Sequence, residues 1–389
     1  MPSLIAARTD RLMDALSTAD FDVFIATSAV NVMYATGYMT PVAQMAAVHP
    51  MAAIITPDAR RLVLPVADSA PAIDFGIPPE EIVAFGRFYF ASPTGEAPST
   101  WADRHASLAE AVAVALGQLG VTSERIGLDG AGLGPNEDEV RASLPAGAGV
   151  VDATVWARSV RARKTEPELA LLRHSAELAV QGIDRAVAAA TPGMTERDLA
   201  RLVAGTMVEG DAVPKFVIVT SGPRSALADA LTTDRAIQPG DLVRFDVGCL
   251  YEGYWSDIGR TAVVGPPTAR QQSRYDAIYA AEQAQLDTVK AGANAGDLFT
   301  LGMKTVEAGG ISGYRRQHCG HGIGAEVYEH PIIAAGVDAP LLAGMTYCFE
   351  TPYYELGWGG MMVEDTVAVT EDGAVSFTDT DRTLRVIPA

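Results

Sequence analysis

Two aspartates in the second half of the chain are spaced so that their carboxylates could meet. Asp246 lies within an apolar strand pattern at residues 243–247, and Asp257 follows eleven positions later. If residues 251–253 form a hairpin turn, the two side chains face each other across antiparallel strands on one side of the sheet. Facing carboxylates repel each other unless a cation or a proton lies between them. The spacing therefore indicates a cation site.

The same arrangement recurs roughly a hundred residues later, with a histidine nearby. Glu350 and Glu364 are symmetric about Gly357, in a turn-rich segment where a hairpin would again place two carboxylates opposite each other. His321 lies in the segment 318–324, whose glycines allow close backbone approach. One imidazole added to four carboxylates is a mixed nitrogen and oxygen ligand set, which suits Mn, Zn, Fe or Co.

The charge of the predicted ligand set balances that of two divalent ions, because four ionised carboxylates carry four negative charges. A divalent ion lowers the pKa of the water that it binds to about 7, which favours hydrolysis of a carbonyl compound. The alternative is that each acid is an ordinary surface or turn residue, which is the better interpretation of any single Asp or Glu. We prefer the metal site, because both pairs have hairpin symmetry and lie in apolar strand patterns.

The first part of the chain alternates helix and strand patterns, which is typical of an α/β domain. A short helix is predicted at residues 8–16, where Leu12, Ala15 and Leu16 share one face. Strands are predicted at residues 21–26, 51–56, 62–66 and 126–129. This part contains no cluster of catalytic residue types.

The domain boundary is expected where a basic run at residues 158–164 leads into a long helix at residues 166–190. A further helix begins after Thr195, with Asp198 completing a capping box. The later elements are strands at 216–220, 242–249 and 255–264, a helix at 274–291, the glycine-rich loop at 318–324, and strands at 346–353 and 361–370. This order of helices and strands predicts an α+β domain. With the boundary given above, the expected domains are residues 1–155 and 156–389.

Charge and cysteine content restrict the partners and the compartment. The 389-residue chain has 29 Lys and Arg against 48 Asp and Glu, a formal net charge of -19. Phosphate backbones and anionic membranes repel such a chain, so neither nucleic acid nor a membrane is an expected partner. Its three cysteines lack metal-site spacing, which fits a reducing compartment. Because we find neither a signal-peptide pattern nor an apolar run of about 20 residues, a cytoplasmic location is expected.

The segments around these residues resemble those of a known family. The chain is similar to metallopeptidase family M24, which has the pita-bread fold and includes aminopeptidase P, prolidase, methionine aminopeptidase and creatinase. The matching segments are residues 245–248, 256–261, 320–324, 349–350 and 363–366. The front half resembles the creatinase-type N-terminal domain through residues 31–38. The resemblance implies an α+β chain, with a C-terminal pita-bread catalytic domain after an N-terminal α/β domain, as in the proline peptidases.

By this resemblance, Asp246 and Asp257 bind one metal ion, and Asp257 and Glu364 bridge it to a second. His321 and Glu350 complete the ligands of the second ion, and Glu350 also accepts a proton from the attacking water. The family implies two divalent ions, with manganese expected first and zinc, cobalt or iron as alternatives. It also implies a homodimer.

Three positions near these ligands depart from the family pattern. Asp229 and Tyr328 stand where proline peptidases usually have substrate-contacting histidines, which makes both of them candidates for catalysis and substrate binding. Met362 is a substrate-binding candidate at a position where an arginine often binds the substrate carboxylate. His330 could supply an imidazole in place of one of these two histidines, and so could His318. Without an arginine at position 362, Xaa-Pro dipeptides are expected to be poorer substrates than small amides that lack a free carboxylate.

Three functions are compatible with these residues. The first is hydrolysis, with two metal ions, of a C–N bond in a small peptide or amide, similar to that of an Xaa-Pro dipeptidase. The second is a specialised M24 enzyme that acts on a non-peptide metabolite, as a small-amide hydrolase or a lyase. The third is a binding protein without catalysis, which is disfavoured because all five metal-ligand positions are filled. The metal content of the purified protein separates the third function from the other two.

Overall fold

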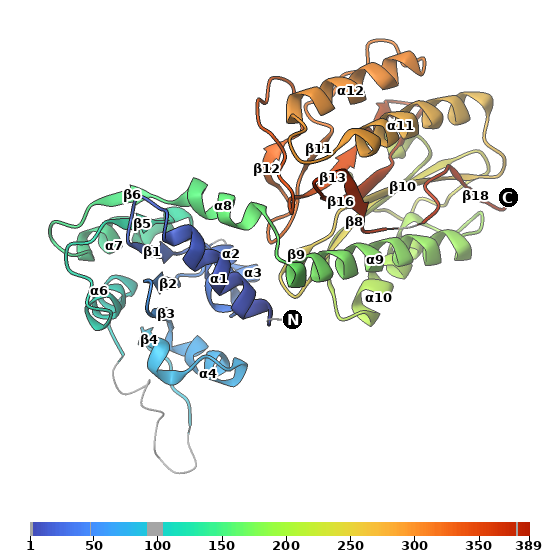
Figure 1. Ribbon diagram of the computed structural model, residues 1–389. Helices are drawn as coiled ribbons and strands as arrows, with labels where there is room; N and C mark the ends of the chain where they lie inside the picture. The colour runs from blue at the N-terminus through green and yellow to red at the C-terminus, as the bar shows by residue number, and fades with distance from the viewer. Residues whose placement is uncertain (1–2, 47, 92–103, 379) are drawn as a thin grey trace. The chain divides into compact units, whose positions relative to one another are not determined.

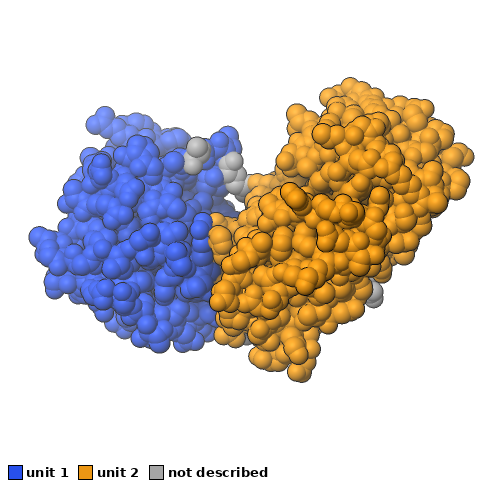
Figure 2. All heavy atoms as spheres, turned by 90° about the horizontal axis from the view of Figure 1, so that it is seen from above, with its two compact units in different colours: residues 1–160 blue, residues 161–389 orange. Residues whose placement is uncertain are grey.

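The computed structural model describes residues 3–46, 48–91, 104–378 and 380–389 (Figure 1). The chain divides into two compact units, residues 1–160 and 161–389, which Figure 2 colours separately. The boundary lies within helix α8 (Thr154–Ala162). Trp156 of this helix packs edge-on against Phe21 and Phe24, with its ring centroid 4.9 Å from each of theirs. The first turn of α8 therefore belongs to the core of the first unit.

The first unit is built around a six-stranded mixed sheet. Its strands are β1 (Val23–Ala26), β2 (Ala52–Ile55), β3 (Arg60–Pro65), β4 (Ile82–Phe85), β5 (Ile126–Leu128) and β6 (Val150–Asp152). Its helices, besides α8, are α1 (Leu4–Leu16), α2 (Ala29–Thr36), α3 (Val42–Met45), α4 (Val66–Phe75), α6 (Leu108–Gln118) and α7 (Glu137–Ser143). The strand order is β4-β3-β2-β1-β5-β6, in which β1 is antiparallel to β2 and parallel to β5.

Helices cover both faces of this sheet, because alternate strand residues enter two different cores. Ala53 and Ile55 of β2 pack in one core with residues of α1, α2 and α4. Ala52 and Ile54 pack in the other, with residues of α6 and α7. Burial on both faces explains why the strand patterns are continuously apolar, and it confirms the predicted α/β architecture.

The second unit is built on a ten-stranded, mainly antiparallel sheet in the order β12-β11-β13-β16-β10-β8-β7, with β9, β17 and β18 at its margins. Its strands are β7 (Val213–Ser221), β8 (Leu242–Tyr251), β9 (Tyr254–Trp255), β10 (Ile258–Val264), β11 (Gly320–Gly322), β12 (Glu329–Ile332), β13 (Thr346–Glu350), β16 (Glu364–Val369), β17 (Ala374–Ser376) and β18 (Arg385–Ile387). A separate hairpin joins β14 (Tyr353–Glu355) to β15 (Gly359–Met361). The helices are α9 (Glu166–Ala189), α10 (Glu196–Glu209), α11 (Ala269–Thr288) and α12 (Ala295–Ala308).

Helix starts in this unit follow their capping residues. The predicted capping box of Thr195 and Asp198 is present at α10. Helix α11 begins five residues earlier than predicted, because Thr268 and Gln271 form another capping box. Helix α12 was not predicted, although Asn294 caps it. None of the helices in the described ranges is both long enough and apolar enough to cross a lipid bilayer.

The hairpin that carries Asp246 and Asp257 differs from the predicted register. Its turn is centred on Glu252 and Gly253, which both have positive φ, at 49° and 86°. This turn pairs Asp246 with Gly259, so that Asp257 is a diagonal neighbour and does not lie directly opposite. The prediction placed the turn one residue too early, because a glutamate rarely adopts the left-handed conformation that this two-residue turn requires.

The second hairpin has the predicted register. Glu350 pairs directly with Glu364, and the hairpin turns at Gly357, whose φ is 82°. The segment 318–324 was predicted as a loop, but its residues 320–322 form β11, which pairs with β13 and so lies in the same sheet. Short glycine-rich strands lack the apolar alternation by which strands are recognised in a sequence.

Buried polar side chains hold the two hairpins together where β10 meets β16. Arg260 donates to the carbonyl oxygen of Glu364 and to Oδ1 of Asp365, both at 2.6 Å. The hydroxyl of Thr261 donates to the carbonyl oxygen of Met362 at 2.9 Å and accepts from the N–H of Met362 at 2.8 Å. These bonds fix the relative position of the strands that carry the candidate metal ligands.

We predict that Asp365→Ala lowers the free energy of unfolding by about 3–5 kcal/mol, because it leaves the guanidinium of Arg260 buried without its carboxylate. The Arg260 and Asp365 side chains are 1% and 0% exposed. Arg382 also loses a partner, since its Nε lies 2.8 Å from Oδ2 of Asp365. Urea denaturation followed by tryptophan fluorescence measures the loss.

The matched control is Asp234→Ala, which breaks an exposed pair with Arg197 whose side chains are 50% and 71% exposed. This control should cost less than about 1 kcal/mol. An equally small cost for Asp365→Ala would show that the buried pair does not hold the hairpins in place.

Candidate metal centre

The candidate carboxylates come from adjacent strands and converge on one cavity. Gly259 of β10 pairs with Asp246 of β8 on one side and with Glu364 of β16 on the other. Glu364 in turn pairs with Glu350 of β13. A cavity of about 210 Å³ is lined by these three acids and by Asp257. The glycine makes room for the side chain of Met362, because a Cβ at position 259 would lie only 2.4 Å from Cγ of Met362 and 3.0 Å from Cβ of Glu364.

His321 joins this group from β11. One ligand atom each from Asp257, His321, Glu364 and Cys348 lies within 4.8 Å of the others. Nε2 of His321 is 3.5 Å from Oδ2 of Asp257. Its Nδ1 is 3.0 Å from the carbonyl oxygen of Gly322, which can only accept. In the neutral imidazole the proton therefore lies on Nδ1, and Nε2 presents its lone pair to the carboxylates.

The donor set fits a metal ion. Among the described residues, the buried side-chain atoms without a hydrogen-bond partner include Nε2 of His321 and Oε2 of Glu364. Leaving such atoms unpaired costs about 1–3 kcal/mol each, and more when they are charged. A divalent cation satisfies both atoms, because imidazole nitrogen and carboxylate oxygen are its usual ligands.

Four of these candidate ligands have a raised pKa. Burial, followed by the charge of Asp257, raises the pKa of Asp246 to about 7. The same two causes raise the pKa of Glu364 well above its ordinary value, and burial raises the pKa of Glu350. Burial lowers the pKa of His321, but its contact with Asp257 outweighs this, so the net shift is upward. A bound cation would displace these protons.

Two arginines and a histidine contact the candidate carboxylates. Arg244 is fully buried and donates to Oδ2 of Asp246 at 2.9 Å. Arg316 Nη2 lies 3.5 Å from Oε2 of Glu350, and His318 Nδ1 lies 3.3 Å from its Oε1. Burial first, and then neighbouring cations, lower the pKa of His318 to about 4. His318 is therefore neutral near pH 7 and contacts Glu350 as a dipole.

Three of the four predicted substrate-binding residues line the cavity. Asp229 is exposed, Met362 is buried, and Tyr328 is 50% exposed. The ring of Tyr328 stacks on that of His321, with centroids 3.8 Å apart and planes at 20°. His330 is exposed on β12 and is not among the described residues of the cavity wall. Its position gives no support to a role in substrate binding.

The sequence reasoning missed several residues of this site. Cys348 precedes Glu350 by two positions on β13, so the alternation of a strand places both on one face. The same rule could have found Arg244, which lies two positions before the ligand on β8. Arg316 and Tyr354 also line the cavity. They come from an irregular segment and from the separate hairpin, where no periodicity of the main sheet could have identified them.

Comparison with known proteins places both units in a family. Residues 170–371 match the sequence profile of metallopeptidase family M24, and residues 8–163 match that of the creatinase/prolidase N-terminal domain. The chain is 35% identical over 229 residues to the Xaa-Pro dipeptidase of Pyrococcus furiosus, and this match covers 58% of this chain and 66% of that protein. The matches to the curated relatives thus span just under two thirds of their length.

Solved structures agree over nearly the whole chain. The dipeptidase PepE from Mycobacterium ulcerans superimposes with a TM-score of 0.77 at 27% identity, over 100% of this chain and 99% of its own. An Xaa-Pro dipeptidase from Bacillus anthracis superimposes with a TM-score of 0.81 over 98% and 99%, at 23% identity, which establishes the fold alone. The first unit is a creatinase-type α/β domain and the second has the pita-bread fold, as predicted. Since the M24 profile covers more than half of its residues, the chain belongs to metallopeptidase family M24.

Proposed function

We propose that the chain is a metal-dependent hydrolase that cleaves a C–N bond in a short peptide, like the Xaa-Pro dipeptidases to which it is similar. One observation carries the proposal: four carboxylates line one cavity, and His321 has a ligand atom within 4.8 Å of those of two of them, Asp257 and Glu364. Nε2 of His321 and Oε2 of Glu364 are buried without a hydrogen-bond partner among the described residues. Such an arrangement is unfavourable as a purely structural cluster, because buried like charges repel one another.

We propose two divalent ions, manganese first and zinc, cobalt or iron as alternatives. The residues that would hold them are Asp246, Asp257, His321, Glu350 and Glu364. The charge balance supports two ions, because four ionised carboxylates carry four negative charges. When bound, such ions polarise a carbonyl group and lower the pKa of water.

We propose that Glu350 accepts a proton during the reaction. Its carboxylate lines the cavity and is oriented by Arg316 and His318, at 3.5 and 3.3 Å. Burial raises the pKa of Glu350, which makes it a better proton acceptor than an exposed glutamate. Burial also raises the pKa of Tyr328, so its phenol stays protonated and can donate a hydrogen bond to the substrate.

Met362 offers no charge at the position where an arginine often binds the substrate carboxylate. Arg316 lies in the wall of the same cavity and supplies a guanidinium that the sequence pattern did not place there. We therefore propose dipeptides with a free carboxylate as substrates, in place of the expectation that they are poor ones.

A second candidate function is conversion of a small non-peptide amide. Asp229 and Tyr328 favour it, because an acid and a phenol line the cavity where the proline peptidases usually present imidazoles. A panel of dipeptides and small amides, assayed with Mn, Zn, Co and Fe, separates the two functions. Turnover of small amides without turnover of any dipeptide would favour this second function.

We also propose a cytoplasmic homodimer. The three cysteines are buried and free, which fits a reducing compartment, and the family resemblance supports the dimer. A monomeric mass in multi-angle light scattering would refute the dimer.

We predict that Asp257→Ala and Glu364→Ala each lower turnover by about a thousand-fold or more, since each would remove a carboxylate proposed to hold the ions. Bound metal, measured by mass spectrometry of the purified protein, should fall in both variants. Glu371→Ala, which removes an exposed acid outside the cavity, is the control and should change neither quantity.

Retention of metal and turnover in both variants would refute the metal assignment. If the wild-type protein contains no metal and added ions do not stabilise it, the third function, a binding protein without catalysis, would be favoured instead.

Metal-free protein should lose stability between about pH 5 and about pH 8, because its folded state binds more protons than its unfolded state in this range. The folded-state pKa values of Asp246, Glu350 and Glu364 are all raised, that of Asp246 to about 7. The free energy of unfolding therefore falls as pH rises through these values. Added manganese should remove the loss, since the ion replaces the protons.

Calorimetry of EDTA-treated protein, with and without manganese, checks this pH dependence. The double variant Asp246→Asn, Glu364→Gln should show a flatter profile without metal, which separates the site from the general effect of net charge. A metal-free melting temperature that stays constant or rises over this range would contradict the prediction.

Asp229→Asn should raise KM for a dipeptide about ten-fold and change kcat less than about two-fold, because it removes a charge that can pair with the substrate's ammonium group. Steady-state kinetics with Ala-Pro measures both constants. Asp234→Asn is the control, because it neutralises an exposed aspartate that pairs with Arg197 outside the cavity. An unchanged KM in Asp229→Asn would exclude this role.

A further inference from the structure

A fully buried arginine joins the candidate metal centre to the segment that carries Asp229. Arg244 lies on β8, two positions before the candidate ligand Asp246, and its side chain is 0% exposed. Its Nη1 donates to Oδ2 of Asp246 at 2.9 Å. A guanidinium has five N–H donors, so this bond leaves most of them for other partners.

The other bonds of Arg244 go to backbone carbonyl groups of a single segment. Its Nε donates to the carbonyl oxygen of Ser225 at 3.1 Å, and its Nη2 donates to those of Leu227 and Ala228 at 3.0 and 2.5 Å. These residues come just before Asp229, which lines the metal cavity. One guanidinium therefore holds both a candidate metal ligand and the backbone that leads to a candidate substrate-binding residue.

We call residues 225–231 the Asp229 segment. It begins at the end of the short helix η4 (Gly222–Ala226) and then has neither helix nor strand. Leu227 and Leu231 are 40% and 86% exposed. An irregular segment with exposed side chains buries too little surface to fix its own conformation. The position of Asp229 therefore depends on the bonds that neighbouring side chains make to the segment.

A second arginine holds the same segment from the other end. Nη2 of Arg224 donates to the carbonyl oxygen of Leu231 at 2.7 Å, and its Nε lies 3.3 Å from both carboxylate oxygens of Glu196. Glu196 begins α10 and is not among the described residues that line the metal cavity. Arg224 thus anchors the segment without a candidate metal ligand as its counter-charge, which makes it a natural comparison for Arg244.

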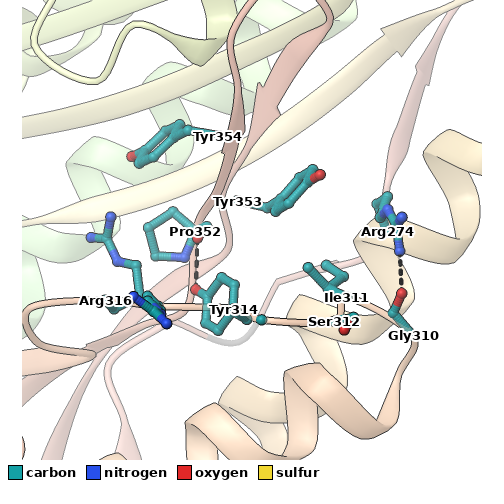
Figure 3. Close-up of a pocket in the computed structure, with 11 residues that line it drawn as sticks. Arg274, Gly310, Ile311, Ser312, Tyr314, Arg316, Pro352, Tyr353 and Tyr354 are labelled. Carbon is teal, nitrogen blue, oxygen red and sulfur yellow. Dashed lines mark hydrogen bonds between the residues drawn. The ribbon is translucent and has the colours of Figure 1, made fainter.

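Packing restricts the guanidinium of Arg244. The ring centroid of Tyr354 lies 5.3 Å from Cζ of Arg244 and 5.5 Å from Cζ of Arg316; Figure 3 shows Tyr354 and Arg316. Ser225, one of the acceptors, packs closely against β15, because a Cβ at Gly360 would lie 2.2 Å from its carbonyl oxygen. The N–H of Gly360 also donates to Oγ of Ser225 at 2.8 Å. Arg244 is therefore a rigid connection and not a flexible surface side chain.

We propose that Arg244 is a positioning residue that couples occupation of the metal centre to the conformation of the Asp229 segment. Once a metal ion restrains the carboxylate of Asp246, Arg244 transmits this restraint to the backbone before Asp229. The coupling is reciprocal, so a segment ordered around a substrate tightens metal binding in return. The inference rests on the roles proposed above for Asp246 in metal binding and for Asp229 in substrate binding.

Hydrogen–deuterium exchange, followed by mass spectrometry on metal-free and manganese-saturated protein, tests this coupling without a substrate. In the wild-type protein, manganese should slow exchange in peptides that cover the Asp229 segment at least about five-fold, the lower end of typical couplings between sites. Arg244→Met should remove this manganese effect. Arg224→Met is the matched control, because it should speed exchange in both states and keep the manganese effect.

Arg244→Lys keeps the test decisive if the loss of a buried charge unfolds Arg244→Met. Lysine retains a counter-charge for Asp246, but a single ammonium group cannot replace the four bonds of the guanidinium fork. The manganese effect on the Asp229 segment should therefore be lost in Arg244→Lys as well.

Steady-state kinetics with Ala-Pro at saturating manganese provide a second measurement, which a purely structural role would not satisfy. Arg244→Met should raise KM about ten-fold, and adding Asp229→Asn should raise it by no more than about two-fold further, because both changes act through the same carboxylate. Effects on KM that multiply would show that the two residues act independently, and would exclude the positioning role.

Two exchange results would overturn the coupling. The first is manganese that binds to the wild-type protein and leaves exchange of the Asp229 segment unchanged. The second is a manganese effect that persists in both Arg244 variants. A manganese effect that needs Arg244, in a protein that turns over no peptide or amide, would instead support the coupling and refute the proposed hydrolysis.

Discussion

Mutual repulsion among buried carboxylates is the constraint on which the architecture of the second unit depends. Asp246, Asp257, Glu350 and Glu364 share one small cavity, and their proximity and burial raise the pKa of three of them. No fold gains stability from such an arrangement by itself. It becomes favourable when cations enter, and the unpaired nitrogen of His321 lies where it can complete their ligands. The proposed metal would therefore link the stability of this unit to its chemistry.

Buried side chains that are not candidate metal ligands hold the strands together against this repulsion. Arg260 joins the backbone of β16 to a buried carboxylate beside the metal ligand, and Thr261 adds two further bonds between the hairpins. Arg244 neutralises part of the charge of Asp246 from within the protein. Gly259 leaves the centre of the row without a side chain. The ligands are thus held in position by contacts outside the cavity, while their metal-binding atoms remain available.

Side chains of both charges line the cavity. Asp229 supplies an exposed negative group, whereas Arg316 supplies a positive group in the same wall. Met362 shows that one position does not determine the charge of the wall. The charge absent at that position is present on Arg316, which comes from another segment of the chain.

Local chemistry made much of this protein predictable from its sequence. Two acids at hairpin spacing in apolar strands are expected to face each other, so the pairing of Glu350 with Glu364 followed from the sequence alone. The pairing partner of Asp246 could not be predicted from the sequence. It depends on the left-handed backbone conformation of Glu252, which residues other than glycine rarely adopt. The α/β architecture of the first unit was also predictable, since its strands are apolar on both faces.

Only the tertiary structure decided which residues surround the ligands. Arg316 reaches the cavity from an irregular segment and Tyr354 from the separate hairpin of β14 and β15, whereas exposed His330 lies outside its described wall. The physical reason is that spacing along a strand determines which face a side chain occupies, whereas the packing of irregular segments depends on contacts between residues far apart in the chain.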